Sequence, residues 1–67
     1  MESGTVTEFD DARGLGTITA ADGTVRPFHC TAIADGTRTI APGTRVGFTV
    51  RPGHHGREEA TAVTPLS

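Results

Sequence analysis

The side chains with the clearest binding chemistry in this chain are its six arginines. They are its only basic residues apart from histidine, because the chain contains no lysine. A guanidinium stacks on flat rings and contacts a phosphate through two N–H groups. Arg13 precedes a glycine-spaced segment, and Arg38, Arg51 and Arg57 could line loops around a groove. An arginine bias is also what a GC-rich coding sequence would give. The formal net charge of -2 argues against binding nucleic acid mainly through an overall positive field.

The segment Arg13-Gly14-Leu15-Gly16-Thr17-Ile18 carries the most informative pattern. It has the basic-Gly-x-Gly-x-aliphatic form of an RNA-binding strand motif, whose aromatic positions stack on bases. Leu15 and Thr17 occupy those aromatic positions. In an extended strand these two side chains share one face with Thr19, while Ile18 points to the other, so we predict Ile18 in the core. The pattern therefore predicts the strand but not the usual stacking.

Other chemistries have little support in the sequence. The single Cys30 cannot form an internal disulfide or supply a cysteine-based zinc site alone. His54 and His55 are adjacent in a Gly-flanked loop and lack the spacing of a structural zinc site, so we interpret them as a solvated pair. No nucleophile stands at motif spacing from a base, and there is no phosphate loop. We therefore expect no enzyme activity, no cofactor and no metal.

The 67 residues are enough for one small domain, which we expect to span 1–67 with its core at 4–66. No segment shows helical periodicity, and Thr31 to Ile40 is expected to be a loop with one short helical turn. Turn signals at Asp10-Asp11 and Asp22-Gly23 separate β-prone runs. The five expected strands are 4–9, 14–20, 25–30, 44–50 and 59–63. Short strands at this spacing predict an all-β, five-stranded antiparallel barrel.

A series of ordered matches runs along nearly the whole chain and resembles the bacterial cold-shock domain. The matches are Gly4-Thr5-Val6, Phe9, Gly14-x-Gly16-x-Ile18, Asp22-Gly23, His29, Ala32-Ile33, Asp35-Gly36, Gly43 to Phe48 with Val50, and Ala60 to Leu66. The resemblance implies an OB-fold barrel that binds single-stranded RNA or DNA. The resemblance is stronger evidence for the fold than for the activity, because a fold and its binding site are separate claims.

In this family, nucleic acid lies on aromatic side chains across one face of the barrel. Of seven such positions this chain keeps only His29; the others carry Glu8, Leu15, Thr17, Pro27, Cys30 and Thr37. Base stacking on an aromatic ring is worth ~1–3 kcal/mol. Losing ~1 kcal/mol at four positions would cost ~4 kcal/mol, roughly a thousandfold in affinity. Glu8 also places a negative charge where a phosphate chain would pass.

The third strand leaves two readings open. Pro27 cannot donate to a sheet ladder, so this strand must lie at an edge or be bulged there. An ungapped alignment puts Arg26 and Phe28 at buried positions of the family, and an unpaired buried arginine is costly. We favour a bulge at Pro27 that turns Val25 inward instead.

The resemblance also suggests which residues would bind nucleic acid, and each has a plainer alternative. Phe9 is expected to pack in the core or at the margin of the binding face, and Arg13 is either a phosphate or base contact or a solvated turn residue. Phe28 and Phe48 are expected in the core. The predicted binding residues are Phe9, Arg13, Leu15, Thr17, His29, Arg38 and Arg57.

Two functions follow as hypotheses. The first is a cold-shock-like protein that binds single-stranded RNA or DNA weakly through an aromatic-poor face. The second is an OB-fold module that has lost nucleic-acid binding and serves as a protein-interaction domain. No apolar run is long enough to cross a bilayer, and the first residues lack the features of a signal peptide. We expect a soluble, cytoplasmic monomer without membrane contact.

Overall fold

Five antiparallel strands form one sheet in the computed structural model, which describes residues 2–34, 36, 38–52 and 58–66. The sheet order is β3-β2-β1-β4-β5. The strands are β1 (Glu2–Asp10), β2 (Leu15–Ala20), β3 (Val25–His29), β4 (Arg45–Pro52) and β5 (Glu58–Pro65). A 3-10 turn, η1 (Cys30–Ala32), follows β3. The all-β prediction with five antiparallel strands is confirmed, as is the short helical turn.

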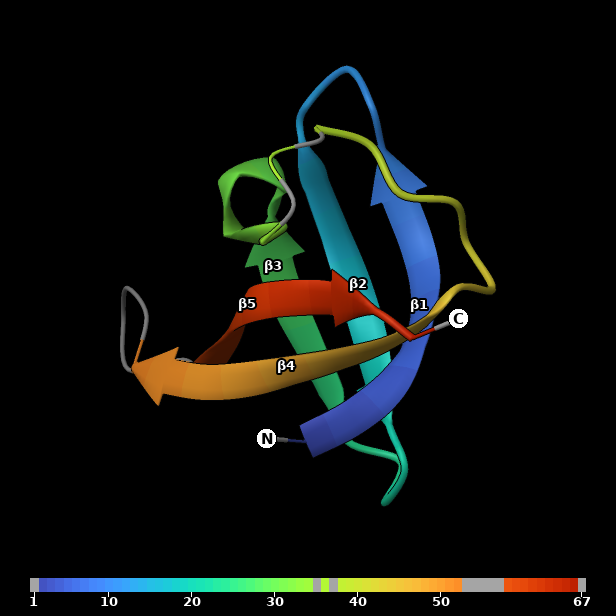
Figure 1. The fold of residues 1–67 in the computed structure, drawn as a ribbon, viewed down its shortest axis with the longest axis vertical. Coiled ribbons are helices and arrows are strands. Elements are labelled where there is room, and N and C mark those ends of the chain that lie inside the picture. Colours follow the sequence, from blue (N-terminus) through green and yellow to red (C-terminus); the bar gives the residue numbers. More distant parts are fainter. Residues whose placement is uncertain (1, 35, 37, 53–57, 67) are drawn as a thin grey trace.

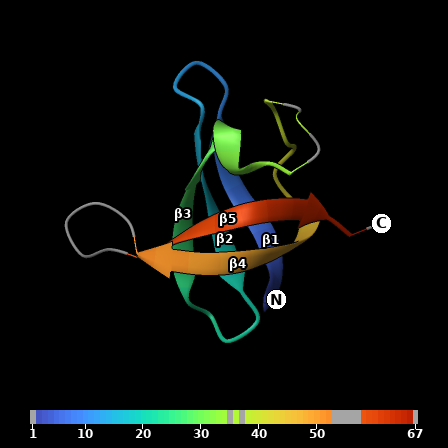
Figure 2. The same ribbon diagram turned by 60° about the vertical axis from the view of Figure 1, so that its left-hand side comes forward.

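The core lies between two parts of this sheet. The β4–β5 hairpin crosses in front of the β1–β2–β3 meander, which is visible from two directions in Figures 1 and 2. The buried side chains between them are Val6, Ile18, Ala20, Phe28, Ile33, Val46, Phe48, Ala60 and Val63. Ile18, Phe28 and Phe48 therefore occupy the core as predicted.

The edge strand β5 contacts both β3 and the segment that follows η1. At one end Arg26 Nη1 lies 3.1 Å from Glu58 Oε1. At the other end Ile33 forms a parallel bridge with Val63, and the N–H of Ala34 donates to the Val63 carbonyl at 2.8 Å. These contacts bring the two edges of the five-stranded sheet toward each other.

Aspartate side chains hold the two predicted turns of the meander. Asp10 Oδ1 accepts the N–H groups of Ala12 at 3.0 Å and Arg13 at 3.3 Å. In the next turn Asp22 Oδ1 accepts the N–H of Thr24 at 2.9 Å. This hydrogen bond to Thr24 is the main reason that the pKa of Asp22 is lowered. Both turns follow the local side-chain to backbone pattern that the sequence predicts.

The predicted bulge in the third strand is wrong. The register between β2 and β3 runs without interruption from Leu15–His29 to Thr19–Val25. Val25 is 58% exposed, whereas the Arg26 side chain is only 20% exposed. Arg26 can point inward because its stem covers the core while its guanidinium reaches Glu58 on β5. Pro27 is tolerated because β3 is an edge strand, the other reading that the sequence allowed.

Candidate nucleic-acid interface

The outer face of β1, β2 and β3 carries two parallel rows of side chains. Strand register places Glu8 opposite Thr17, and Thr17 opposite Pro27, which defines the first outer row. The second outer row runs from Asp10 through Leu15 to His29. Glu8, Pro27, Asp10, Leu15 and His29 are exposed and Thr17 is half-buried. Alternation along the strands thus brings Leu15, Thr17 and His29 together as the sequence predicted.

Between the two outer rows lies an inner row formed by Phe9, Gly16 and Phe28. The rings of Phe9 and Phe28 stack, with centroids 5.9 Å apart and planes 17° apart. They meet because Gly16 has no side chain: a Cβ there would lie 2.7 Å from Phe28 Cζ and 2.8 Å from the Glu8 carbonyl oxygen. Phe9 is half-buried against the core. The prediction of core or margin packing for Phe9 is confirmed.

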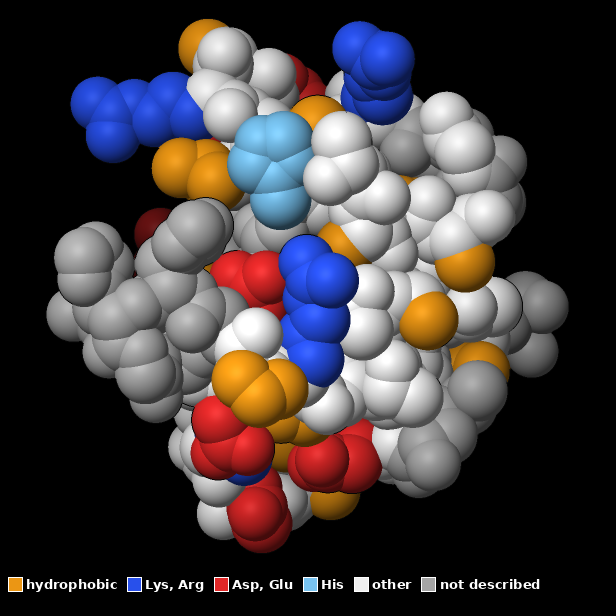
Figure 3. All heavy atoms as spheres, turned by 90° about the vertical axis from the view of Figure 1, so that its left-hand side faces the viewer, with side chains coloured by type: hydrophobic (Ala, Val, Ile, Leu, Met, Phe, Trp, Pro, Cys, Tyr) orange, Lys and Arg blue, Asp and Glu red, His pale blue; other side chains and the backbone are white. Residues whose placement is uncertain are grey.

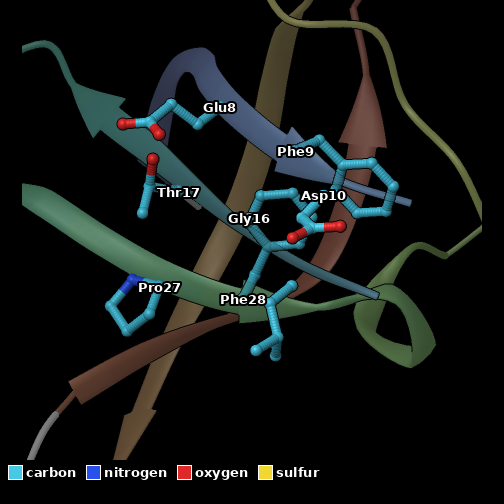
Figure 4. A pocket seen from close by; sticks show the side chains of 8 residues that line it. Glu8, Phe9, Asp10, Gly16, Thr17, Pro27 and Phe28 are labelled. Atoms are coloured by element: carbon cyan, nitrogen blue, oxygen red, sulfur yellow. The ribbon is translucent and has the colours of Figure 1, made fainter. Parts of the chain in front are cut away.

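A hollow of about 340 Å³ lies over Gly16 on this face. Its lining residues are Glu8, Phe9, Asp10, Leu15, Gly16, Thr17, Pro27 and Phe28. Figure 4 shows the polar ends of Glu8 and Thr17 near each other at one side, with Pro27 standing on β3. The floor of the hollow is apolar and its rim carries carboxylates and a hydroxyl.

Three threonines form a hydroxyl cluster beside the hollow. Thr7 Oγ1 lies 3.0 Å from Thr19 Oγ1, and it donates to the Thr17 carbonyl at 3.3 Å. Thr17 Oγ1 donates to Thr7 Oγ1 at 3.5 Å. Thr7 reaches both neighbours because the β1–β2 register shifts between Val6 and Glu8, which inserts one extra residue in β1. This part of the face offers hydroxyl groups and no flat ring for stacking.

His29 provides an exposed ring at the end of the second outer row. Its Nδ1 accepts the N–H of Thr31 at 3.3 Å and lies 3.0 Å from Thr31 Oγ1. This contact caps η1 and orients the ring. Nε2 makes no hydrogen bond within the described residues, so it remains able to contact a ligand. Cys30 Sγ lies 3.7 Å from Nδ1, and Cys30 itself is half-buried.

The arginines named here differ in how closely an acidic side chain pairs with them. Arg26 and Arg51 are paired with Glu58 and Glu59 across strands. The Arg13 side chain is 77% exposed, and its Nε lies 3.9 Å from Asp10 Oδ2. Arg38 is exposed and makes no ion pair within the described residues. Figure 3 shows arginine side chains on both sides of a histidine, with acidic side chains gathered toward the lower end of the same view.

A model of the "Cold-shock" DNA-binding domain matches residues 2–66. The chain belongs to the cold-shock domain family. Cold-shock domains are OB-fold barrels that bind nucleic acid and are not enzymes, so the predicted fold and the absence of catalysis stand. A search of curated proteins finds no significant match.

In this cold-shock domain, sequence reasoning missed several residues of the hollow. Phe28 was assigned only to the core, although its ring also forms part of the hollow's floor. Asp10 was assigned only to a turn, and Thr7 was given no role. The register of β1 against β2 was the missing signal, because the extra residue at Thr7 shifts the face to which Glu8 and Asp10 point. Arg57, a predicted binding residue, and Thr37, a stacking position of the family, lie outside the described residues.

Other kinds of site find no support in the parts of the cold-shock domain that the structure describes. Within those ranges no three His, Cys, Asp or Glu side chains gather closely enough to hold a metal ion. His54 and His55 fall in the undescribed stretch 53–57. The described residues also include no helix of the length and apolar character needed to span a membrane.

Proposed function

We propose that this cold-shock domain binds single-stranded RNA or DNA weakly, through contacts that are more electrostatic and hydrogen-bonded than stacked. The observation that carries the proposal is the composition of the outer rows. Glu8, Thr17, Pro27 and Leu15 occupy positions at which the family places aromatic rings, and His29 alone offers a ring. With base stacking worth ~1–3 kcal/mol each, the affinity falls well below that of an aromatic platform.

The remaining binding chemistry comes from arginines at the margin of this face. Arg13 is 77% exposed and, at 3.9 Å from Asp10, is held only by a weak surface ion pair. Arg38 has no ion pair within the described residues, so both guanidinium groups are available to phosphates. Arg57 joins them in the proposal on sequence grounds. Phe9, Leu15 and Thr17 would contact bases from the hollow, and His29 would stack at its end.

The test is a titration of fluorescently labelled single-stranded oligonucleotides, followed by anisotropy at several salt concentrations. Three phosphate contacts, from Arg13, Arg38 and Arg57, predict that log affinity falls with log salt at a slope of about -2.1. Arg13→Ala should reduce that slope by about 0.7. Arg51→Ala is the matched control, because it removes the same charge from an arginine already paired with Glu59. No binding at low salt and high micromolar protein would contradict the proposal.

A second candidate is a protein-interaction module. It is favoured by two exposed apolar side chains on the same face, Leu15 at 48% and Val25 at 58%. Capture of partners from native lysate with and without nuclease separates the two functions. Partners that persist after nuclease treatment favour the protein-interaction module, while partners that disappear favour nucleic-acid binding.

A further inference from the structure

We propose that the hollow over Gly16 is a slot for a single base and that Glu8 makes it selective for guanine. This inference rests on the proposed binding of single strands and adds a base preference to it. It comes from the residues that replace the aromatic platform in this chain, and from the space that they leave. Two features of the hollow carry it, the apolar floor and the free carboxylate at the rim. The third argument is the arrangement of hydrogen-bond donors on guanine.

The floor and walls of the hollow suit a flat ring. Gly16 is buried in the inner row, and Phe9 and Phe28 on either side of it stack on each other and give the hollow an apolar floor. Leu15 and Pro27 provide apolar walls from the two outer rows. A hollow of about 340 Å³ has room for one base. One base at a time is therefore the occupant that the shape favours.

The rim determines which base is preferred. Asp10 Oδ1 already accepts the N–H groups of Ala12 and Arg13. The Glu8 carboxylate, in contrast, is exposed and has no hydrogen bond within the described residues. An ionised carboxylate only accepts hydrogen bonds and can take two parallel donors at once. Glu8 is therefore the group that selects among bases.

Guanine is the base that offers two adjacent donors on its Watson–Crick edge, the ring N1–H and the N2 amino group. Adenine and cytosine each place an amino group beside an unprotonated ring nitrogen, whose lone pair repels a carboxylate. Thymine and uracil present one N–H between two carbonyl oxygens. A neutral base edge can also approach Glu8, whereas a phosphate is repelled by it. Charge and donor pattern thus point to the same base.

The experiment compares labelled dT9 with the same oligonucleotide carrying one central guanine, using anisotropy with the full chain. We expect the guanine oligonucleotide to bind about tenfold more tightly, as one bidentate base contact provides. Replacing the guanine by hypoxanthine removes only the amino group and should abolish most of that gain. Adenine or cytosine at the same position should give little gain over thymine.

Glu8→Gln tests the role assigned to the carboxylate. The amide places its NH₂ group against one of guanine's donors, so the preference should fall to less than about threefold. The dT9 affinity should stay the same or rise, because a negative charge is lost. Glu2→Gln is the matched control: it makes the same charge change at an exposed position of β1 outside this hollow. Circular dichroism checks that each variant is folded.

The outcomes distinguish the two proposals. If neither oligonucleotide binds, the proposed nucleic-acid function is overturned, and the guanine slot with it. If both bind with equal affinity, or if another base is preferred, the guanine slot alone is overturned. A guanine preference that survives Glu8→Gln also overturns the slot, because the selectivity then arises elsewhere.

Discussion

On β1, β2 and β3, the side chains that point inward are closely packed, whereas those that point outward are exposed or half-buried. The inner row of Phe9, Gly16 and Phe28 is closely packed, with a ring contact at 5.9 Å and no room for a Cβ at Gly16. The outer rows hold Glu8, Thr17, Pro27, Asp10, Leu15 and His29, whose side chains are exposed or half-buried. Neighbouring residues on one strand thus belong to two different environments.

The difference shows how a cold-shock fold can accept small and polar side chains on the outer face of these strands. A core position must be filled by a side chain of suitable volume, since close packing makes even small changes costly. An exposed position on the outer face has no such requirement, because water accepts polar and small side chains equally well. Substitutions on the outer face are therefore expected to affect the stability of the fold much less than substitutions in the core.

The strongest test of this contrast compares the loss of a core side chain, here from β4, with the loss of a side chain on the outer face. Phe48 is fully buried at 0% exposure, while Leu15 on the outer face is 48% exposed. Phe48→Ala should lower the free energy of unfolding by about 3–5 kcal/mol. Leu15→Ala should lower it by less than about 1 kcal/mol. Urea unfolding followed by far-UV circular dichroism measures both, since the chain has no Trp or Tyr for fluorescence; equal losses would contradict the contrast.

A second test restores the binding surface on the unchanged barrel. The triple variant Leu15→Phe, Thr17→Phe and Glu8→Gln supplies two stacking rings and removes the rim charge. Two bases stacked at ~1 kcal/mol each predict a gain of roughly thirtyfold in dT9 affinity.

The stability of the triple variant should remain within about 1 kcal/mol of the parent, because all three positions are on the outer face. Anisotropy titrations give the affinity, and urea unfolding gives the stability. A stable variant with no gain in affinity would show that the outer rows do not carry the nucleic-acid contacts.

The smallest expected effect concerns Arg26, the one charged side chain at an inward position of β3. Its Nε is buried without a hydrogen-bond partner, while Nη1 lies 3.1 Å from Glu58. Glu58→Gln should lower the free energy of unfolding by up to about 1 kcal/mol, since Glu58 is 59% exposed and solvent screens the pair.

The companion variant Arg26→Met keeps the long stem and removes the unpartnered nitrogen. It should leave the stability unchanged or raise it, because an apolar side chain of similar size often replaces a partly buried ion pair without loss. A large loss in Arg26→Met by urea unfolding would mean that the Arg26–Glu58 pair is needed to hold β3 against β5.

Prediction from sequence succeeded where a residue's role depends on its near neighbours. Alternation identified Ile18 and Phe48 as core residues, and each predicted strand is found with ends shifted by at most two residues. The Asp10 and Asp22 turns follow from side chains that bond to the backbone two or three residues ahead. Leu15, Thr17 and His29 lie on one face as expected, while the binding roles of Phe9, Arg13, Leu15, Thr17, His29, Arg38 and Arg57 remain predictions.

Prediction failed where the partner is distant in the chain. A bulge at Pro27 was favoured because an inward Arg26 had no visible partner, yet Glu58 lies 32 positions away and reaches it from β5. The extra residue at Thr7 likewise could not be seen in β1 alone, because a register shift exists only relative to the paired strand. Both features depend on which strands meet.

The amino-acid sequence by itself determined that this protein is a five-stranded cold-shock domain. Strand alternation, turn chemistry and glycine spacing are local properties, and local physics is enough to specify them. Only the tertiary structure decided that Phe9 and Phe28 meet across Gly16, and that Glu8 stands at the rim of the resulting hollow. These contacts join three strands, so their geometry is set by register and packing and cannot be read from one segment alone.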